Sequence, residues 1–142
     1  MSGFLLDTNV LSEIRKKECD QNVKKWIEKQ PPARLFVSSV TLAEISYGAE
    51  LVKDQNFKHT LMLWLDSVLR PWFEGRTLEI TEDVIVRWRE LVQIGRKSHY
   101  TFSQPDLFIA AQADLHGLCV VTRNVKDFEK ANVAVLNPWD AQ

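Results

Sequence analysis

Hydrophobic and polar positions alternate with two different periods along the chain, and the change of period separates strands from helices. Short runs of β-branched and large apolar residues predict strands, whereas apolar residues spaced three and four positions apart predict helices. The predicted strands are residues 3–7, 34–39, 77–80, 118–122 and 133–137. The predicted helices are residues 8–16, 22–30, 40–52, 57–69, 81–97, 105–117 and 126–130. Strands separated by helices imply a parallel sheet covered on both faces.

Chain length and apolar content fit one folding unit. The chain has 142 residues, of which 45% are hydrophobic, and this is enough for one core. Residues 1–142 are therefore expected to form a single α/β/α sandwich with a central, mainly parallel sheet of roughly four to five strands. The helix at 105–117 is apolar nearly all round, so we expect it to be buried and to end at Gly117.

Net charge and cysteine content limit the partners and the cellular compartment that the sequence fits. Lys and Arg number 18 against 19 Asp and Glu, so no whole-molecule field favours nucleic acid or an acidic membrane, and any basic surface must be local. Cys19 and Cys119 lie far apart and outside any C-x-x-C motif, which favours reduced thiols over a disulfide framework. The sequence has neither a signal-peptide pattern nor an apolar run long enough to span a membrane. We expect a cytoplasmic protein.

Acidic side chains follow several of the predicted strands. Asp7 ends the first strand, Glu44 lies about one helical turn past the second, and Asp106 opens the buried helix. Asn124 and Asp127 follow the most strand-like stretch of the chain. Because ligands of parallel sheets bind beyond the carboxyl ends of the strands, these side chains are expected to meet at one edge.

Helix capping is the alternative explanation for each acid taken singly. Asp7 fits an N-cap, and Asp106 fits a capping box that begins at Ser103. Glu44 fits a second capping box that begins at Thr41. Asn124 and Asp127 are placed to cap the short helix at residues 126–130 in the same way.

The position of Glu44 on its helix indicates a role besides capping. Glu44 shares one stripe of the helix with Val40, Tyr47, Gly48 and Leu51. Because an apolar stripe is expected to face the core, Glu44 is expected to point inward. Two carboxylates about 4 Å apart repel by roughly 4 kcal/mol at an effective dielectric constant of about 20. A half-buried cluster therefore needs protons or a cation. Oxygen donors with no His or Cys at ligand spacing favour Mg²⁺, with Mn²⁺ as a substitute, over zinc.

A basic side chain is the other means of neutralising such a cluster. Arg123 and Lys126 both lie close in sequence to Asn124. Either one could form a structural ion pair with the acids, since buried charge is normally paired. The sequence leaves this alternative open.

Four segments of the chain resemble the signature segments of the PIN-domain ribonucleases. They are LLDTNVLSEI, SSVTLAEISYG, QPDLFIAAQA and CVVTRNVKDFE, in that order. The likeness covers essentially the whole chain and is strongest for the VapC and FitB toxins of bacterial type II toxin–antitoxin modules. It implies a Mg²⁺-dependent endoribonuclease that forms a homodimer and is held inactive by a small antitoxin of the VapB or FitA kind.

The resemblance also implies roles for individual acids. The metal-binding acids of the family match Asp7, Glu44 and Asp106, whereas a fourth acid found in many members is replaced here by Asn124. Because of that replacement, the number of metal ions, one or two, stays open. Asp127 is the candidate substitute for the missing fourth acid. We assign Asp7 and Asp106 as direct ligands, and Glu44 as a ligand or as the base that orients the water attacking an RNA phosphodiester.

Hydroxyl and amide side chains are expected to support these acids. Thr122 and Asn124, together with Asp127, are predicted to orient a ligand or water through hydrogen bonds. Thr8 is predicted to bond a carboxylate or the phosphate, and a helix-capping hydroxyl is an equally good explanation for it.

RNA binding requires local positive charge. The candidates are Arg15, Lys16, Lys17, Arg96, Lys97 and Arg123. Solvated surface charge explains each of them as well, but a few phosphate contacts suffice to hold a loop substrate.

Two other readings of the sequence concern function. A catalytically silent PIN-like module that binds protein or RNA would keep the fold, and Asn124 is its best support. A phosphatase or phosphotransferase of another α/β type is disfavoured because neither a D-x-D nucleophile motif nor G-x-x-x-x-G-K-[ST] occurs. A Rossmann cofactor enzyme is disfavoured because G-x-G-x-x-G is absent from the sequence. The apolar excess of residues 57–69 suggests a protein interface, although a well-covered core helix explains it nearly as well.

Overall fold

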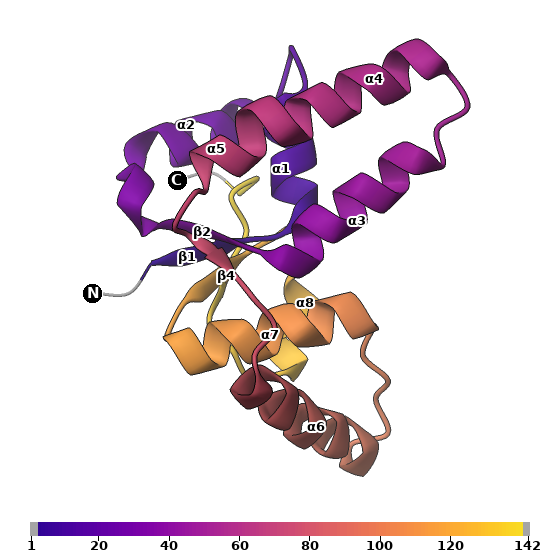
Figure 1. Cartoon of the computed structure of the whole chain (residues 1–142). Coiled ribbons are helices and arrows are strands. Elements are labelled where there is room, and N and C mark those ends of the chain that lie inside the picture. The colour runs from indigo at the N-terminus through magenta and orange to yellow at the C-terminus, as the bar shows by residue number, and fades with distance from the viewer. Residues whose placement is uncertain (1–2, 141–142) are drawn as a thin grey trace.

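A computed structural model describes residues 3–140 of the protein and places a five-stranded sheet at its centre (Figure 1). The strands are β1 (Phe4–Leu6), β2 (Leu35–Ser38), β3 (Thr77–Leu78), β4 (Cys119–Val121) and β5 (Val135–Leu136). Every adjacent pair is parallel, and the order across the sheet is β3-β2-β1-β4-β5. The predicted α/β architecture with a mainly parallel sheet is confirmed.

Helices connect the strands in chain order. They are α1 (Thr8–Arg15), α2 (Gln21–Lys29), the 3₁₀ turn η1 (Pro32–Arg34), α3 (Ser39–Glu50), α4 (Gln55–Trp64), the π-helical turn η2 (Leu65–Leu69), α5 (Arg70–Trp72), α6 (Glu82–Lys97), α7 (Gln104–His116) and α8 (Val125–Lys130). No helix within residues 3–140 is long and apolar enough to cross a membrane.

The direction in which strands are added to the sheet reverses at β1. The chain first adds β2 and β3 on one side of β1, and later adds β4 and β5 on the other side. Because β1 and β4 pair in parallel with Leu6 opposite Val121, the next residues, Asp7 and Thr122, emerge side by side. A switch point of this kind opens a crevice at the carboxyl ends of the strands, where ligands bind in α/β proteins.

Alternating strand residues supply two hydrophobic cores, one on each face of the sheet. Leu5 and Val120 belong to the core that includes residues of α6 and α7. Leu6 and Val121 belong to the core that includes residues of α1 and α2. Figure 1 shows these two groups of helices on opposite sides of the strands. Since successive side chains of a strand point to opposite faces, the central strands are buried on both sides.

The helix predicted at residues 105–117 is confirmed and positions one of the candidate acids. α7 buries Leu107, Ile109 and four further residues, and it ends at Gly117, whose φ of 65° suits glycine. Its N-cap is Ser103, whose Oγ accepts a hydrogen bond from the backbone N–H of Asp106 at 3.4 Å. The first turn of this buried helix therefore fixes the backbone of Asp106.

The end of the helix predicted at residues 57–69 was wrong. Helical structure continues from α4 through η2 and α5 as far as Trp72, although residue 71 is proline. The backbone N–H of Arg70 donates to the carbonyl of Leu65, five residues back. A wider π turn just before Pro71 reduces the clash that a proline ring causes in a regular helix, so helical structure continues past the proline.

Gly95 lets the segment that leads to α7 lie directly against α6. The backbone N–H of Tyr100 donates to the carbonyl of Gly95 at 2.8 Å. A Cβ atom on Gly95 would lie 2.8 Å from the carbonyl oxygen of Tyr100 and 2.9 Å from the ring of Phe102. Glycine is therefore required here by close approach, and the approach fixes the path of residues 100–102 toward Asp106.

Substitution of two helical glycines by alanine should have opposite effects on stability. Gly95→Ala should lower the free energy of unfolding by roughly 1–3 kcal/mol, because the added methyl group overlaps Tyr100 and Phe102. Gly48→Ala in α3 should raise it by up to about 1 kcal/mol, because nothing lies within 4 Å of the added atom. Urea unfolding of the two variants measures the difference, and equal stabilisation by both would contradict the close approach.

Candidate active site

A pocket of about 460 Å³ opens at the carboxyl edge of the sheet. Its lining residues are Asp7, Thr8, Asn9, Ser12, Glu13, Lys16, Glu44, Asp106, Arg123, Asn124 and Trp139. The structure thus brings together the three acids Asp7, Glu44 and Asp106, which lie far apart in the sequence. They come from the end of β1, from α3 and from the first turn of α7.

Asp7 is both a helix cap and a pocket acid. It is the N-cap of α1, and its carboxylate accepts hydrogen bonds from the backbone N–H of Thr8 and from the hydroxyl of Thr122, each at 2.8 Å. Only 5% of the residue is exposed. Burial raises the pKa of Asp7, the bonds from Thr122 and Thr8 oppose this rise, and the charge of Asp106 adds to it. The capping explanation is therefore correct but incomplete.

Glu44 reaches the pocket from a helix face that is exposed, not buried as predicted. Tyr47 and Leu51 on its stripe are each 64% exposed, so the expectation that this stripe faces the core was wrong. The capping-box explanation was also wrong, because α3 begins at Ser39 and its cap is the Ser38 hydroxyl. With the helix starting two residues before Thr41, Glu44 falls in the second turn and lies at the pocket rim.

The carboxyls of Glu44 and Asp106 share the electrostatic environment of Asp7. Partial burial in the pocket raises the pKa of Glu44, and the charges of Asp7 and Asp106 raise it further. Burial likewise raises the pKa of Asp106, and the nearby Asp127 charge adds to the rise. Thr8 approaches Glu44 with an Oγ1 to Oε1 distance of 3.5 Å. All three acids therefore resist ionisation in the absence of a compensating cation.

Thr122 connects the acid pocket to its surroundings through one buried hydroxyl. Thr122 Oγ1 donates to Asp7 at 2.8 Å and accepts from the side-chain amide of Asn9 at 3.1 Å and from the backbone N–H of Asn124 at 3.0 Å. A hydroxyl has one proton and two lone pairs, so all its hydrogen-bonding capacity is used. Thr122 thus fixes the orientation of the Asp7 carboxylate, and its predicted role toward a ligand or water stays a prediction.

Asn124 and Asp127 occupy different positions relative to the pocket. Asn124 lines it, and although it is the N-cap residue of α8, its side chain makes no capping hydrogen bond. Asp127 lines the neighbouring hollow and accepts a hydrogen bond from the Tyr100 hydroxyl at 2.5 Å. Its charge still acts on Asp106. The substitution of Asp127 for the missing fourth acid stays a prediction.

The predicted RNA-binding residues separate into two groups. Lys16 and Arg123 line the pocket. Arg15 instead places its guanidinium over the rings of Phe57 and Trp64 of α4, at 5.5 and 5.9 Å from the ring centroids. Lys17, Arg96 and Lys97 lie outside the pocket, with Lys17 in the hollow beside Lys16.

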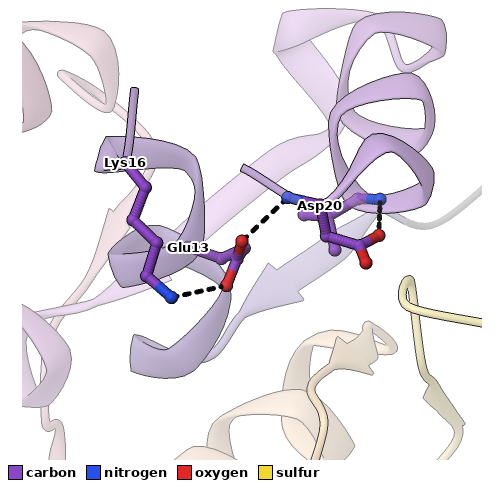
Figure 2. Close-up of polar contacts among 4 residues, drawn as sticks. Glu13, Lys16 and Asp20 are labelled. Carbon is purple, nitrogen blue, oxygen red and sulfur yellow. Dashed lines mark hydrogen bonds and ion pairs between the residues drawn. The ribbon is translucent and has the colours of Figure 1, made fainter. Parts of the chain in front are cut away.

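Three residues on one polar face of α1, Asn9, Ser12 and Glu13, were missed by the sequence reasoning, whereas Lys16 on the same face was predicted as an RNA-binding residue. Asn9, Ser12, Glu13 and Lys16 are spaced as neighbours on a helix and all line the pocket. Figure 2 shows the Glu13 carboxylate between Lys16 and Asp20, accepting from Lys16 Nζ at 3.2 Å and from the Asp20 backbone N–H at 2.8 Å. The Asp20 bond, aided by Lys16, lowers the pKa of Glu13. Helical spacing of polar residues after Asp7 was the signal that could have identified this face.

Trp139 was also missed, since nothing local links the end of the chain to the first strand. The side-chain amide of Asn22 donates to its carbonyl at 2.8 Å, and its backbone N–H donates to Asn137 at 2.9 Å. Its ring packs against the core beneath α1 and α2. Only the tertiary fold places Trp139 in the wall of the pocket.

The donor set of the pocket suits a hard divalent cation. None of the ion pairs within residues 3–140 includes Asp7, Glu44 or Asp106, so neither Arg123 nor Lys126 neutralises them. In this part of the chain, no three His, Cys, Asp or Glu side chains converge closely enough to hold a metal ion as they stand. Mg²⁺ does not require such a cage, because it commonly binds through one or two carboxylates and keeps several waters.

The raised pKa of Asp7 predicts how stability depends on pH without divalent metal. The folded protein holds the Asp7 proton more tightly than the unfolded chain, so the penalty is absent below the ordinary pKa of 3.8 and grows as pH rises through the raised value. Asp7→Asn removes the charge and keeps an oxygen for the bond from the Thr8 N–H, but its amide group cannot also accept the bond from Thr122. The lost bond is independent of pH, whereas the relieved charge is not, so the melting temperature of the variant relative to the wild type in EDTA should increase by a few degrees from acidic to neutral pH.

Thermal unfolding followed by circular dichroism across this pH range measures the effect. Asp66→Asn is the matched control, because Asp66 is exposed and makes only a surface ion pair with Arg70, which contributes little stability. A melting-temperature difference between Asp7→Asn and the wild type that does not change with pH would refute the pKa argument.

Comparison with known proteins agrees with the fold. Residues 4–133 match the family model of the PIN domain. The plasmid stability protein StbB of Pseudomonas syringae pv. tomato is 35% identical, over 97% of this chain and 99% of that protein. The VapC ribonuclease Y4jK of Sinorhizobium fredii is 32% identical, over 96% of this chain and 98% of that protein.

A solved structure extends the likeness to three dimensions. The crystal structure of FitAcB from Neisseria gonorrhoeae superposes with a TM-score of 0.90 and 32% identity, over 96% of this chain and 98% of that chain. The resemblance of the four sequence segments is thereby confirmed, and the chain belongs to the PIN domain family.

Proposed function

We propose that this protein is a divalent-metal-dependent endoribonuclease and the toxin of a toxin–antitoxin pair. The observation that carries the proposal is one pocket at the switch point of the sheet that Asp7, Glu44 and Asp106 all line, while no ion pair within residues 3–140 joins any of them to a basic side chain. Relatives named VapC ribonuclease and Toxin FitB, the latter 33% identical over 96% of this chain, support the activity.

Mg²⁺, with Mn²⁺ as a substitute, fits the oxygen donors of this pocket. Asp7 and Asp106 would bind the ion directly, and Glu44 would bind it or hold the attacking water. When bound, the ion supplies positive charge against the phosphate and lowers the pKa of water.

The chain's own residues prepare the pocket for this chemistry. Thr122 and the backbone N–H of Thr8 fix both oxygens of Asp7, so that its carboxylate cannot rotate away. Glu44 adds a third carboxylate at the pocket rim, where it could accept a proton from a water molecule. Lys16 and Arg123 at the rim would attract the RNA backbone.

An antitoxin is the proposed protein partner. The solved FitAB complex bound to a DNA fragment is similar to this chain, with a TM-score of 0.90 and 30% identity. The hairpin of α3 and α4 exposes Tyr47, Leu51, Phe57 and Leu63, each by more than two fifths of its surface. Such an apolar surface suits a protein interface, with an antitoxin or with a second copy in the proposed homodimer. An RNA target is consistent with the cytoplasmic location expected from the sequence.

RNA cleavage with matched carboxamide variants tests the proposed activity. Purified protein incubated with total RNA and Mg²⁺ should produce discrete fragments, and EDTA should abolish them. Asp7→Asn and Asp106→Asn should each reduce the cleavage rate by roughly a hundredfold or more, because the ion contributes several kcal/mol of charge stabilisation. Gel analysis with RNA end-labelling measures the rates.

Asp114→Asn is the control for general damage to α7. Asp114 lies on the same helix as Asp106 but outside the pocket, where it pairs with Arg87 at 2.7 Å. This variant should cleave at the wild-type rate. Intact RNA under all conditions, with a folded wild-type protein, would favour the catalytically silent binding module instead.

A further inference from the structure

Arg123 and Trp139 form a stacked pair in the wall of the acid pocket. The guanidinium carbon of Arg123 lies 4.7 Å from the centroid of the Trp139 ring. Both residues line the same pocket as Asp7 and Asp106. The pair is therefore adjacent to the acids that, under the proposed function, act on the scissile phosphate.

Separate parts of the fold hold the two members of the pair in place. Arg123 directly follows the buried Thr122, and its backbone N–H donates to the Asn9 side chain at 3.3 Å. Trp139 is half-buried, packs against one hydrophobic core and is tied at its carbonyl to Asn22. Arg123 itself is exposed. The tryptophan ring is thus held in a fixed position, and the guanidinium lies over it at the surface.

The charge of Arg123 is directed at the ring rather than at the acids. No ion pair within residues 3–140 joins it to Asp7, Glu44 or Asp106. A planar cation on an indole face is a favourable arrangement that also keeps the guanidinium oriented. Single-stranded RNA is commonly held by stacking of its unpaired bases on aromatic rings or guanidinium planes.

We propose that Arg123 and Trp139 form a stacking platform for the nucleobase of a nucleotide adjacent to the scissile phosphate of single-stranded RNA. This inference rests on the proposed ribonuclease function and assigns the platform to that substrate. RNA is favoured over a protein ligand because the platform and the phosphate-directed acids share one pocket, which places a base and a phosphate of one strand side by side.

Removal of single bases from the substrate tests the platform. The substrate is a short unstructured RNA whose cleavage position has been mapped with the wild-type protein, together with versions that carry an abasic ribose at each nucleotide flanking that position. One abasic version should lower the wild-type kcat/KM by about tenfold, as expected for loss of one stacked base. In Arg123→Ala the same abasic version should cause little further loss.

Two further variants separate stacking from charge. Arg123→Lys keeps the positive charge but lacks the planar group, so it should lose base dependence as Arg123→Ala does. Lys130→Ala is the matched control, because Lys130 also lies over an aromatic ring, that of Tyr100 at 4.3 Å, but lies outside the pocket. Lys130→Ala should retain the full abasic effect.

Fluorescence anisotropy in EDTA gives a readout that does not depend on cleavage. It uses a labelled short unstructured RNA in which the abasic ribose is placed at each position in turn, so that no mapped cleavage position is needed. A base-dependent affinity that Arg123→Ala removes supports the platform even if the protein cleaves no RNA, in which case the proposed catalysis alone fails. An abasic effect of equal size in wild type, Arg123→Ala and Arg123→Lys overturns the platform. The platform is also overturned if Arg123→Ala keeps the full abasic effect but loses affinity for an antitoxin, because Arg123 would then bind protein and not a nucleobase.

Discussion

Burial of the Asp7 carboxylate at the point where strand order reverses is the constraint on which the rest of the site depends. β1 and β4 are buried on both faces, so the first residue beyond each has little room to turn toward solvent. Asp7 is 5% exposed and is held by Thr8 and Thr122. Burial raises the pKa of Asp7, so ionisation of this carboxyl costs stability unless a cation compensates for the charge.

The surrounding elements place further acids beside this charge instead of relieving it. The Ser103 cap fixes the first turn of α7, and with it Asp106, while α3 lets Glu44 reach the pocket from the solvent side. Gly95 holds the segment before α7 against α6, so the position of Asp106 depends on a contact far from the chemistry. The fold therefore maintains a concentration of negative charge at a cost in stability, which supports the proposal of a divalent-cation site in this pocket.

The sequence predicted those features that follow from local periodicity and from the strand-end rule. Asp7 and Asp106 were found because each lies next to a clear strand or helix boundary. The predicted inward stripe of Glu44 failed, since an apolar stripe on a helix marks an interface as well as a core. The continuation of the helix past Pro71 depends on a π turn, and no residue pattern in the sequence predicts such a turn. Trp139 joins the pocket only through tertiary contacts with Asn22 and Arg123.

Binding of Mn²⁺ to the wild-type protein and to single carboxamide variants, followed by electron paramagnetic resonance of the free ion, tests the central claim most directly. A site shared by acids from β1 and α7 predicts that Asp7→Asn and Asp106→Asn each weaken Mn²⁺ binding by about tenfold or more. Asp114→Asn, outside the pocket, should bind Mn²⁺ as the wild type does. Mn²⁺ affinity that neither pocket substitution changes would contradict the shared site.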